Sequence, residues 1–453
     1  MTYGQFDNGL RYAVRQSGSS VAYCAMSIRC GTAAEAQSAE GTRFHEGVAH
    51  FCEHTIFKGT SLHNAAYINS CLDKLGGELN AYTTKEEIVL HATVLKEDLP
   101  KAAGLLFELS TCPTFPDQEI EMEKGVVIDE IAACKDSPSE EIYDRFEELF
   151  FAGNPLGRSI LGNPRSVRSI TSTELTQWVK EFFVAGNMAF TIVSPLPEKD
   201  MIRLISALSD KWLNAGKHSL TTDKESSVSE SEESPAQMPQ AYQTAYAPQT
   251  LDPTIFDKTV SRKGHQVNCI MGVAAPSLYG KKKRIAAVLL SNILGGPAGN
   301  SILNSELREK HGLVYNVECS YTQYSPAGII AICFGCDKEN VDKCKSLIRK
   351  EICKLQAKPF SEARLKAAKK QLIGQMAISG ENGETQCLTM GKSLLAYGSV
   401  LDDDHTRKVI EEISVEELSD AAKELFAEDR TAILTYLTGT PADKRWTKDK
   451  KTK

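Results

Sequence analysis

The chain has 453 residues, of which 42% are apolar and 25% are charged, and its formal net charge is −7. Because an ordinary domain has about 100–200 residues, we expect at least two domains. The acidic balance and the lack of a basic stripe exclude a nucleic-acid-binding protein. No run of about 18 apolar residues occurs in the sequence, which excludes a membrane-spanning helix.

The N-terminal residues 1–12 contain neither a basic stretch followed by an apolar run nor an Arg/Ser-rich amphipathic pattern. They do not resemble a signal or transit peptide, so we expect a cytoplasmic protein, unless a presequence has been removed. The thirteen cysteines lie scattered in apolar segments, which predicts buried free thiols in a reducing compartment. The close pair Cys333 and Cys336 has no second pair nearby, so a four-cysteine zinc ribbon is not supported.

The apolar patterns predict elements in the same order in both halves of the chain. They are a strand at 21–29 and helices at about 47–57 and 98–111, then a strand at 266–274 and helices at 281–294, 361–377 and 414–426. Between them, the Ser/Glu-rich segment 218–253 has too few large apolar residues to fold and predicts a flexible linker. We expect an α+β fold with two similar α/β-sandwich (roll) halves, over 1–217 and 254–453.

The helix expected at 47–57 carries the motif His50-x-x-Glu53-His54. Helix positions i and i+4 lie on the same face, so both imidazoles can bind one Zn²⁺. Glu53 lies on that face as well and can act as general base toward an attacking water. The flanking residues are apolar and predict a buried helix, in which these polar side chains need a partner such as a metal ion. The alternative is a chance match of three residues.

A catalytic zinc commonly has three protein ligands and one open position. The acidic segment 117–131 reads as a helix in which Glu123 and Glu130 share a face, about two turns apart. Periodicity does not choose between these two glutamates as the third ligand. Either can instead belong to a solvated acidic face.

The motif and its surroundings resemble the pitrilysin/insulinase family of metallopeptidases, most closely the branch of mitochondrial processing peptidase and its bacterial relatives. In that family the motif is followed by a helix with two glutamates separated by six residues, at the distance found here for Glu123 and Glu130. The resemblance implies that Glu130 is the third ligand of one Zn²⁺ per chain. It also implies that Glu123 orients the ligands.

The segment Asn80, Ala81, Tyr82, Thr83 resembles the family's edge strand beside the zinc, which binds the substrate as an added β-strand. An ordinary sheet edge is the alternative for this segment.

In the second half, residues 307–315 resemble the family's L-R-E-K-x-G-L-x-Y stretch. This implies that Arg308 and Tyr315 donate hydrogen bonds to the substrate carbonyl and the developing oxyanion. The alternative is a helix-surface arginine and an ordinary strand tyrosine. Cys52 departs from the family's usual leucine, but it lies about 200° around the helix from His50 and points away from the metal.

The resemblance implies a zinc metalloendopeptidase with a catalytic domain over 1–217 and a homologous domain without zinc over 254–453. Family members enclose the substrate in a chamber of four such domains, whereas one chain supplies two. A homodimer, or a heterodimer with a homologous chain, is therefore implied, with peptides or unfolded polypeptide segments as substrates.

Two alternatives to a peptidase follow from the same residues. The first is a non-catalytic structural or partner subunit of a processing-peptidase-like complex. Such subunits have lost the metal ligands, which are present here. The second is a zinc-binding interaction module, which would commonly have four protein ligands, and no fourth ligand is evident in the sequence.

Overall fold

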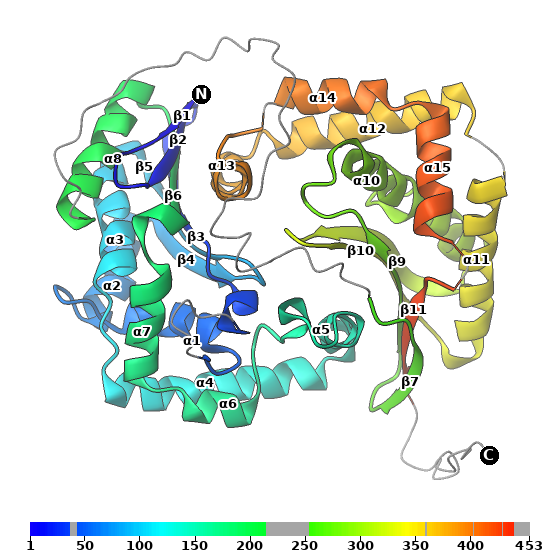
Figure 1. The fold of residues 1–453 in the computed structure, drawn as a ribbon, viewed down its shortest axis with the longest axis horizontal. Helices are drawn as coiled ribbons and strands as arrows, with labels where there is room; N and C mark the ends of the chain where they lie inside the picture. Colours follow the sequence, from blue (N-terminus) through cyan, green and yellow to red (C-terminus); the bar gives the residue numbers. More distant parts are fainter. Residues whose placement is uncertain (37–42, 214–252, 358–359, 402, 428, 439–453) are drawn as a thin grey trace. The chain divides into compact units, whose positions relative to one another are not determined.

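The computed structural model describes residues 1–36, 43–213, 253–357, 360–401, 403–427 and 429–438. The linker expected at 218–253 lies outside this part of the chain, apart from its last residue. The chain divides into two compact units (Figure 1). Unit 1 is made of residues 1–131, 153–249 and 375–403, and unit 2 of residues 132–152, 250–374 and 404–453.

Unit 1 is built on a six-stranded sheet with the strand order β1-β2-β6-β3-β5-β4. The strands are β1 (Thr2–Gln5), β2 (Arg11–Gln16), β3 (Val21–Ile28), β4 (Glu78–Thr83), β5 (Ile88–Leu95) and β6 (Met188–Ser194). All neighbouring pairs are antiparallel except β2 and β6. Among the described strands, β4 pairs with β5 alone and therefore lies at one edge of the sheet.

The main core of unit 1 lies between one face of this sheet and a layer of helices. The helices include α1 (Val48–Thr55), α3 (Leu99–Thr111), α7 (Ser172–Phe182) and α8 (Glu198–Trp212). Leu99, Ala102, Leu106 and Leu109 of α3 are buried, as their helical spacing predicts. Phe51 places α1 in the same core, so the helix with the histidine motif is anchored by apolar packing.

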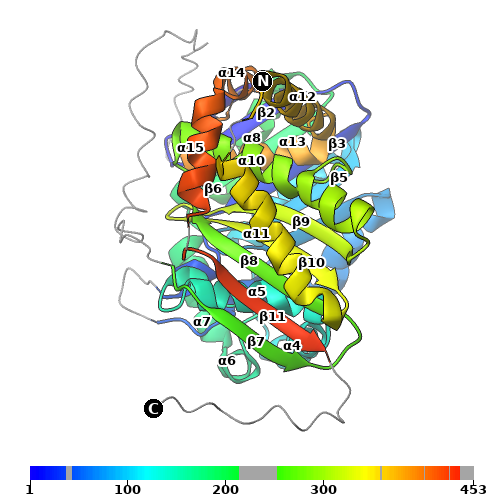
Figure 2. The same ribbon diagram turned by 90° about the vertical axis from the view of Figure 1, so that its right-hand side faces the viewer.

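Unit 2 is built on a five-stranded sheet with the order β7-β11-β8-β10-β9. The strands are β7 (Asp257–Arg262), β8 (Val267–Ala275), β9 (Val314–Gln323), β10 (Gly328–Cys336) and β11 (Ala432–Thr438). Helices α10 (Lys281–Gly295), α11 (Val341–Ala357) and α15 (Val415–Leu425) cover one face (Figure 2). All residues of β10 are buried, which explains its continuous apolar sequence.

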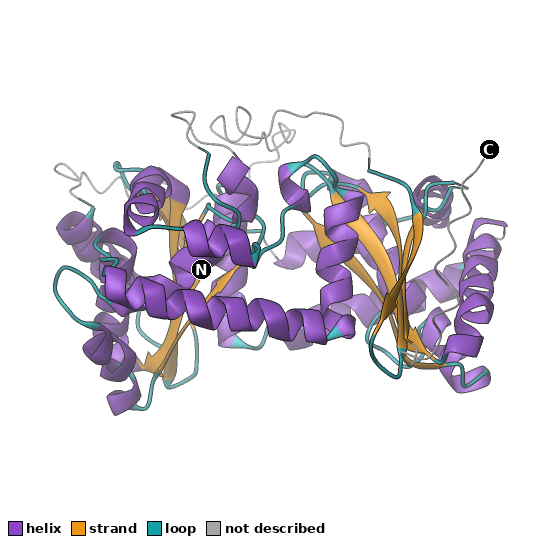
Figure 3. Ribbon diagram, turned by 90° about the horizontal axis from the view of Figure 1, so that it is seen from below, coloured by secondary structure: helices purple, strands orange, loops and turns teal. Residues whose placement is uncertain are grey.

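Each sheet has helices on both of its faces (Figure 3). The helix on the second face comes from the other half of the sequence. Helix α13 (Gly383–Tyr397) packs on β3 and β6 of unit 1, where Leu394 is fully buried. Helix α5 (Pro138–Phe150) packs on β8 and β11 of unit 2. There the ring of Phe146 fills the space above Gly272, at which a Cβ atom would lie 2.5 Å from the ring. The compact units therefore differ from the halves 1–217 and 254–453 by this exchange.

The remaining helices are α2 (Ala65–Cys71), α4 (Asp117–Asp136), α6 (Pro164–Ser169), α12 (Glu362–Ser379) and α14 (Asp403–Glu412). Two mixed α/β sheets confirm the expected fold class, and the strands expected at 21–29 and 266–274 are β3 and β8. The helix expected at 47–57 is α1 followed by a 3₁₀ turn, η2 (Ile56–Lys58).

All thirteen cysteines are free and ten of them are buried. Among the described residues, no helix has both the length and the apolar character needed to cross a membrane.

Candidate metal centre

Three side chains from two helices of unit 1 converge on one point. His50 and His54 lie on α1, and Glu130 lies on α4. The Oε2 atom of Glu130 is 3.4 Å from Nε2 of His54 and 3.8 Å from Nε2 of His50. Each of the three residues offers one ligand atom, and these atoms all lie within 4.8 Å of one another. Helix α4 thus supplies Glu130, rather than Glu123, to the cluster.

The residues of this cluster fit a metal ion. The Oε2 atom of Glu130 is buried and has no hydrogen-bond partner among the described residues, although it faces two imidazoles. Burial, and then the neighbouring His54, lower the pKa of His50 to about 4, so at neutral pH its imidazole is uncharged and can offer a lone pair. Two imidazole nitrogens and one carboxylate oxygen are a donor set typical of catalytic Zn²⁺.

Glu123 lies behind His54 rather than in the cluster. Its Oε1 atom is 2.9 Å from Nδ1 of His54, and its Oε2 atom is 2.6 Å from Nζ of Lys58. Burial acts to raise the pKa of Glu123, but the hydrogen bonds from Lys58 and His54 outweigh it and hold the pKa below its ordinary value. A carboxylate that accepts the Nδ1 proton of His54 leaves Nε2 of that ring free to bind a metal. Sequence reasoning missed Lys58, whose signal is its position four residues after His54.

Glu53 lies beside the cluster without belonging to it. Its Oε2 atom accepts a hydrogen bond of 3.3 Å from Oγ1 of Thr83, on the edge strand β4. Burial raises the pKa of Glu53, His54 and Thr83 oppose this rise, and Glu130 adds to it. A carboxyl group with a raised pKa next to a metal site is suited to accept and return a proton.

The four residues of the expected substrate strand, Asn80, Ala81, Tyr82 and Thr83, lie on β4 at the sheet edge. Their side chains alternate between the faces of the sheet. Ala81 packs against the core that contains α1, whereas Tyr82 packs against the cluster that contains α13. An extended peptide added to this edge would therefore present alternate side chains to two different surfaces.

Arg308 and Tyr315 belong to unit 2, so the structure defines their surroundings within that unit. Arg308 is exposed on the short π-helix η7 (Asn304–Lys310). Tyr315 is 61% exposed on β9, and its hydroxyl donates a hydrogen bond of 2.8 Å to Asp337. Two exposed donors of this kind can serve a bound ligand, and their role stays a prediction.

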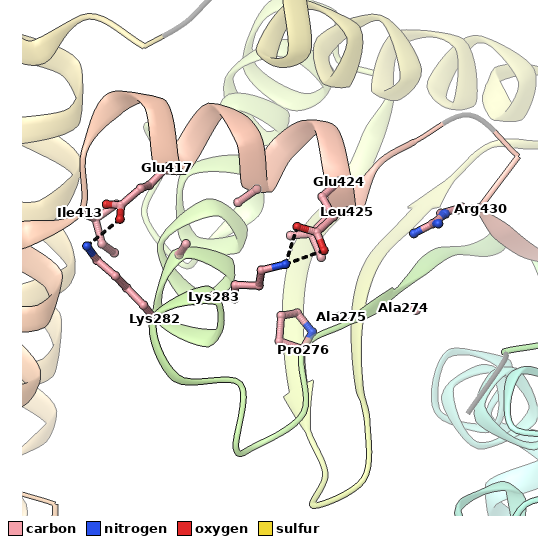
Figure 4. A pocket seen from close by; sticks show the side chains of 12 residues that line it. Ala274, Ala275, Pro276, Lys282, Lys283, Ile413, Glu417, Glu424, Leu425 and Arg430 are labelled. Atoms are coloured by element: carbon pink, nitrogen blue, oxygen red, sulfur yellow. Dashed lines mark hydrogen bonds and ion pairs between the residues drawn. The ribbon is translucent and has the colours of Figure 1, made fainter. Parts of the chain in front are cut away.

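A hollow of about 510 Å³ lies within unit 2 (Figure 4). Seven of its twelve lining residues are small or apolar, and the other five are charged. Two ion pairs join α10 to α15 across it, Lys282 with Glu417 at 2.6 Å and Lys283 with Glu424 at 2.9 Å. Its lining residues include no histidine or cysteine. The hollow therefore lacks the imidazole ligands that α1 provides at the cluster.

Comparison with known proteins identifies the family of this chain. The sequence profile described as "Insulinase (Peptidase family M16)" matches residues 11–164, and that described as "Peptidase M16 inactive domain" matches residues 169–372. The chain belongs to this family, peptidase family M16. The first match contains the whole histidine and glutamate cluster, and the second contains Arg308 and Tyr315.

Relatives of similar length carry the name "uncharacterized zinc protease". One from Mycobacterium leprae is 27% identical over 379 residues, which cover 84% of this chain and 80% of the relative. YmxG of Bacillus subtilis is 24% identical over 438 residues, which cover 95% of this chain and 97% of the relative.

Solved structures share the fold over nearly the whole chain. A protease from Helicobacter pylori has a TM-score of 0.80 at 17% identity and covers 96% of this chain and 98% of its own. A peptidase M16 inactive domain from Pseudomonas fluorescens has a TM-score of 0.79 at 17% identity, with coverages of 97% and 99%. At this identity the likeness shows the fold alone.

Proposed function

We propose that this chain is a zinc-dependent metalloendopeptidase that hydrolyses peptides or unfolded polypeptide segments. The convergence of His50, His54 and Glu130, with Glu53 alongside, is the observation that carries the proposal. The names of the relatives, which are called zinc proteases, support it. When bound, the zinc ion supplies a Lewis acid that polarises the scissile carbonyl and lowers the pKa of water.

Groups of the protein itself transfer the proton, hold the substrate and stabilise the developing negative charge. Glu53 takes the proton of the attacking water and returns it to the leaving amine. Strand β4 holds the substrate backbone in register through its unpaired edge. Arg308 and Tyr315 donate to the carbonyl oxygen as negative charge develops on it.

Hydrolysis of an internally quenched peptide library by the purified protein tests this proposal, with and without a chelator and beside Glu53→Gln. Both proteins should bind one zinc per chain, because Glu53 is not a ligand, and only the wild type should cleave. Cleavage that survives chelation or the Glu53→Gln change would overturn the assignment. A zinc-loaded wild type that cleaves no peptide would favour the alternative of a partner subunit, and a co-purifying homologous chain would then be sought.

We also propose that the active form is a dimer with an identical or homologous chain, and that Arg308 and Tyr315 act in the partner's site. For a homodimer, mixing Glu53→Gln with Arg308→Ala after dissociation tests this. If Arg308 acts across the interface, the mixed dimer has one site with both residues intact, and activity returns. If Arg308 acts within its own chain, every site keeps one defect and the mixture stays inactive.

We propose the cytoplasm as the compartment, since thirteen free thiols fit a reducing environment.

A further inference from the structure

Helix α1, which carries both histidines, has no capping side chain of its own. Its N-cap residue is Gly47, with φ of 87° and no side-chain cap hydrogen bond. A Cβ atom at this position would lie 2.9 Å from the carbonyl oxygen of Leu161. The Ser, Thr, Asn or Asp that usually caps a helix therefore does not fit here. Because Gly47 and Ala49 are buried, their N–H groups need another acceptor.

That acceptor is Glu35, which lies on the 3₁₀ turn η1 (Thr32–Ala36) and is fully buried. Its Oε1 atom accepts hydrogen bonds from the backbone N–H of Gly47 at 3.0 Å and of Ala49 at 3.2 Å. The guanidinium of Arg158 lies 3.5 Å from its Oε2 atom. Ala49 immediately precedes His50, so this carboxyl group fixes the backbone turn from which the first candidate ligand projects.

We propose that Glu35 is a positioning residue for the metal centre. Its carboxyl group caps α1 from outside the helix and so sets the direction of His50 and His54. The inference rests on the proposed zinc-dependent function. In characterised sites, removing a group that orients a metal ligand reduces the metal affinity by about 10–100-fold. Losing the cap of α1 should have an effect of that order, because the helix would shift to solvate its buried N–H groups.

The two oxygens of Glu35 indicate which substitution preserves the cap. Burial raises the pKa of Glu35 to about 8, while the N–H groups of Ala49 and Gly47 and the charge of Arg158 oppose the rise. Both capping bonds end on one oxygen, and the carbonyl oxygen of either a neutral acid or an amide can accept them from the two N–H groups. Glu35→Gln should therefore retain the cap, whereas Glu35→Ala removes it.

The test uses two readouts that do not require peptide cleavage. Zinc affinity is measured by competition with a chromophoric chelator, and the geometry of the centre by the visible spectrum of the Co²⁺-substituted protein. Glu35→Ala should lose about 10–100-fold in zinc affinity and change the Co²⁺ spectrum, and Glu35→Gln should stay close to wild type. Leu394→Ala is the matched control, because it destabilises unit 1 from the sheet face that α13 covers and leaves α1 untouched.

Wild-type affinity in Glu35→Ala, or an equal loss in Leu394→Ala, would overturn the role of Glu35. If Glu35→Ala does not fold, Glu35→Asp decides, since its carboxylate is one methylene too short to reach both N–H groups. A folded Glu35→Asp protein with the wild-type affinity and spectrum would also overturn it. A wild type that binds no zinc would instead refute the proposed function, so the two failures are distinguishable.

Discussion

The Nζ atom of Lys58 lies 2.6 Å from the Oε2 atom of Glu123, and both side chains are largely shielded from solvent. The other oxygen of the same carboxylate meets Nδ1 of His54. A cation, an anion and an imidazole thus form one chain that ends at a candidate metal ligand. Each member restricts the next, so the orientation of the His54 ring depends on a lysine outside the histidine motif.

Replacing Lys58 with Met should weaken zinc binding about tenfold, because Glu123 would lose its counter-ion and hold His54 less firmly. Chelator competition measures this change. Lys124→Met is the matched control, since Lys124 is buried on α4 but pairs with Glu121 instead. Equal affinities of Lys58→Met and wild type would show that the ion pair is dispensable.

The metal-free protein should lose stability in acid through His50. Its pKa is about 4 in the folded protein against an ordinary 6.5, so the unfolded chain binds the proton more readily between these values. The free energy of unfolding is therefore highest above pH 6.5 and falls as the pH drops toward 4, by about 3 kcal/mol from this residue. Urea unfolding of chelated wild type and His50→Gln across this range isolates the contribution. Parallel curves for the two proteins would contradict the prediction.

Thr83→Val should lower kcat about fivefold and leave zinc affinity unchanged, because a hydrogen bond worth about 1 kcal/mol would no longer orient the Glu53 carboxylate. Steady-state kinetics and chelator competition separate the two effects. Thr93→Val, on the neighbouring strand β5, is the control for altering a threonine in this sheet. A loss of zinc affinity in Thr83→Val would mean that Thr83 supports a ligand instead.

Truncating a core side chain of α13 or α5 should destabilise the strands from the opposite half of the sequence on which that helix packs. Leu394→Ala and Phe146→Ala each remove a buried side chain and should cost about 2–5 kcal/mol. Hydrogen exchange should rise in β3 and β6 for Leu394→Ala, and in β8 and β11 for Phe146→Ala, so each variant is the control for the other. A rise confined to the strands of the variant's own sequence half would contradict the exchange.

The sequence by itself determined the local features of this protein. Helical and strand periodicities placed α1, α3, α10, β3 and β8, because apolar spacing reflects which face of an element is buried. The motif His50-x-x-Glu53-His54 placed two imidazoles on one helical face, and the geometry within one helix follows from spacing alone. Resemblance to a family, rather than periodicity, chose Glu130 over Glu123, and the structure brings Glu130 to the two histidines.

Only the tertiary structure decided which distant groups support the candidate site and where the two units divide. Glu35 reaches the start of α1, Thr83 reaches Glu53 and Arg158 pairs with Glu35, all from other elements, and no periodic pattern encodes such contacts. The exchange of α5 and α13 could not be predicted from the sequence either. The sequence of an amphipathic helix shows that it has an apolar face but not which sheet will cover that face. Long-range packing made these choices, since each sheet has two apolar faces and the helix that buries the second one lies far away in the sequence.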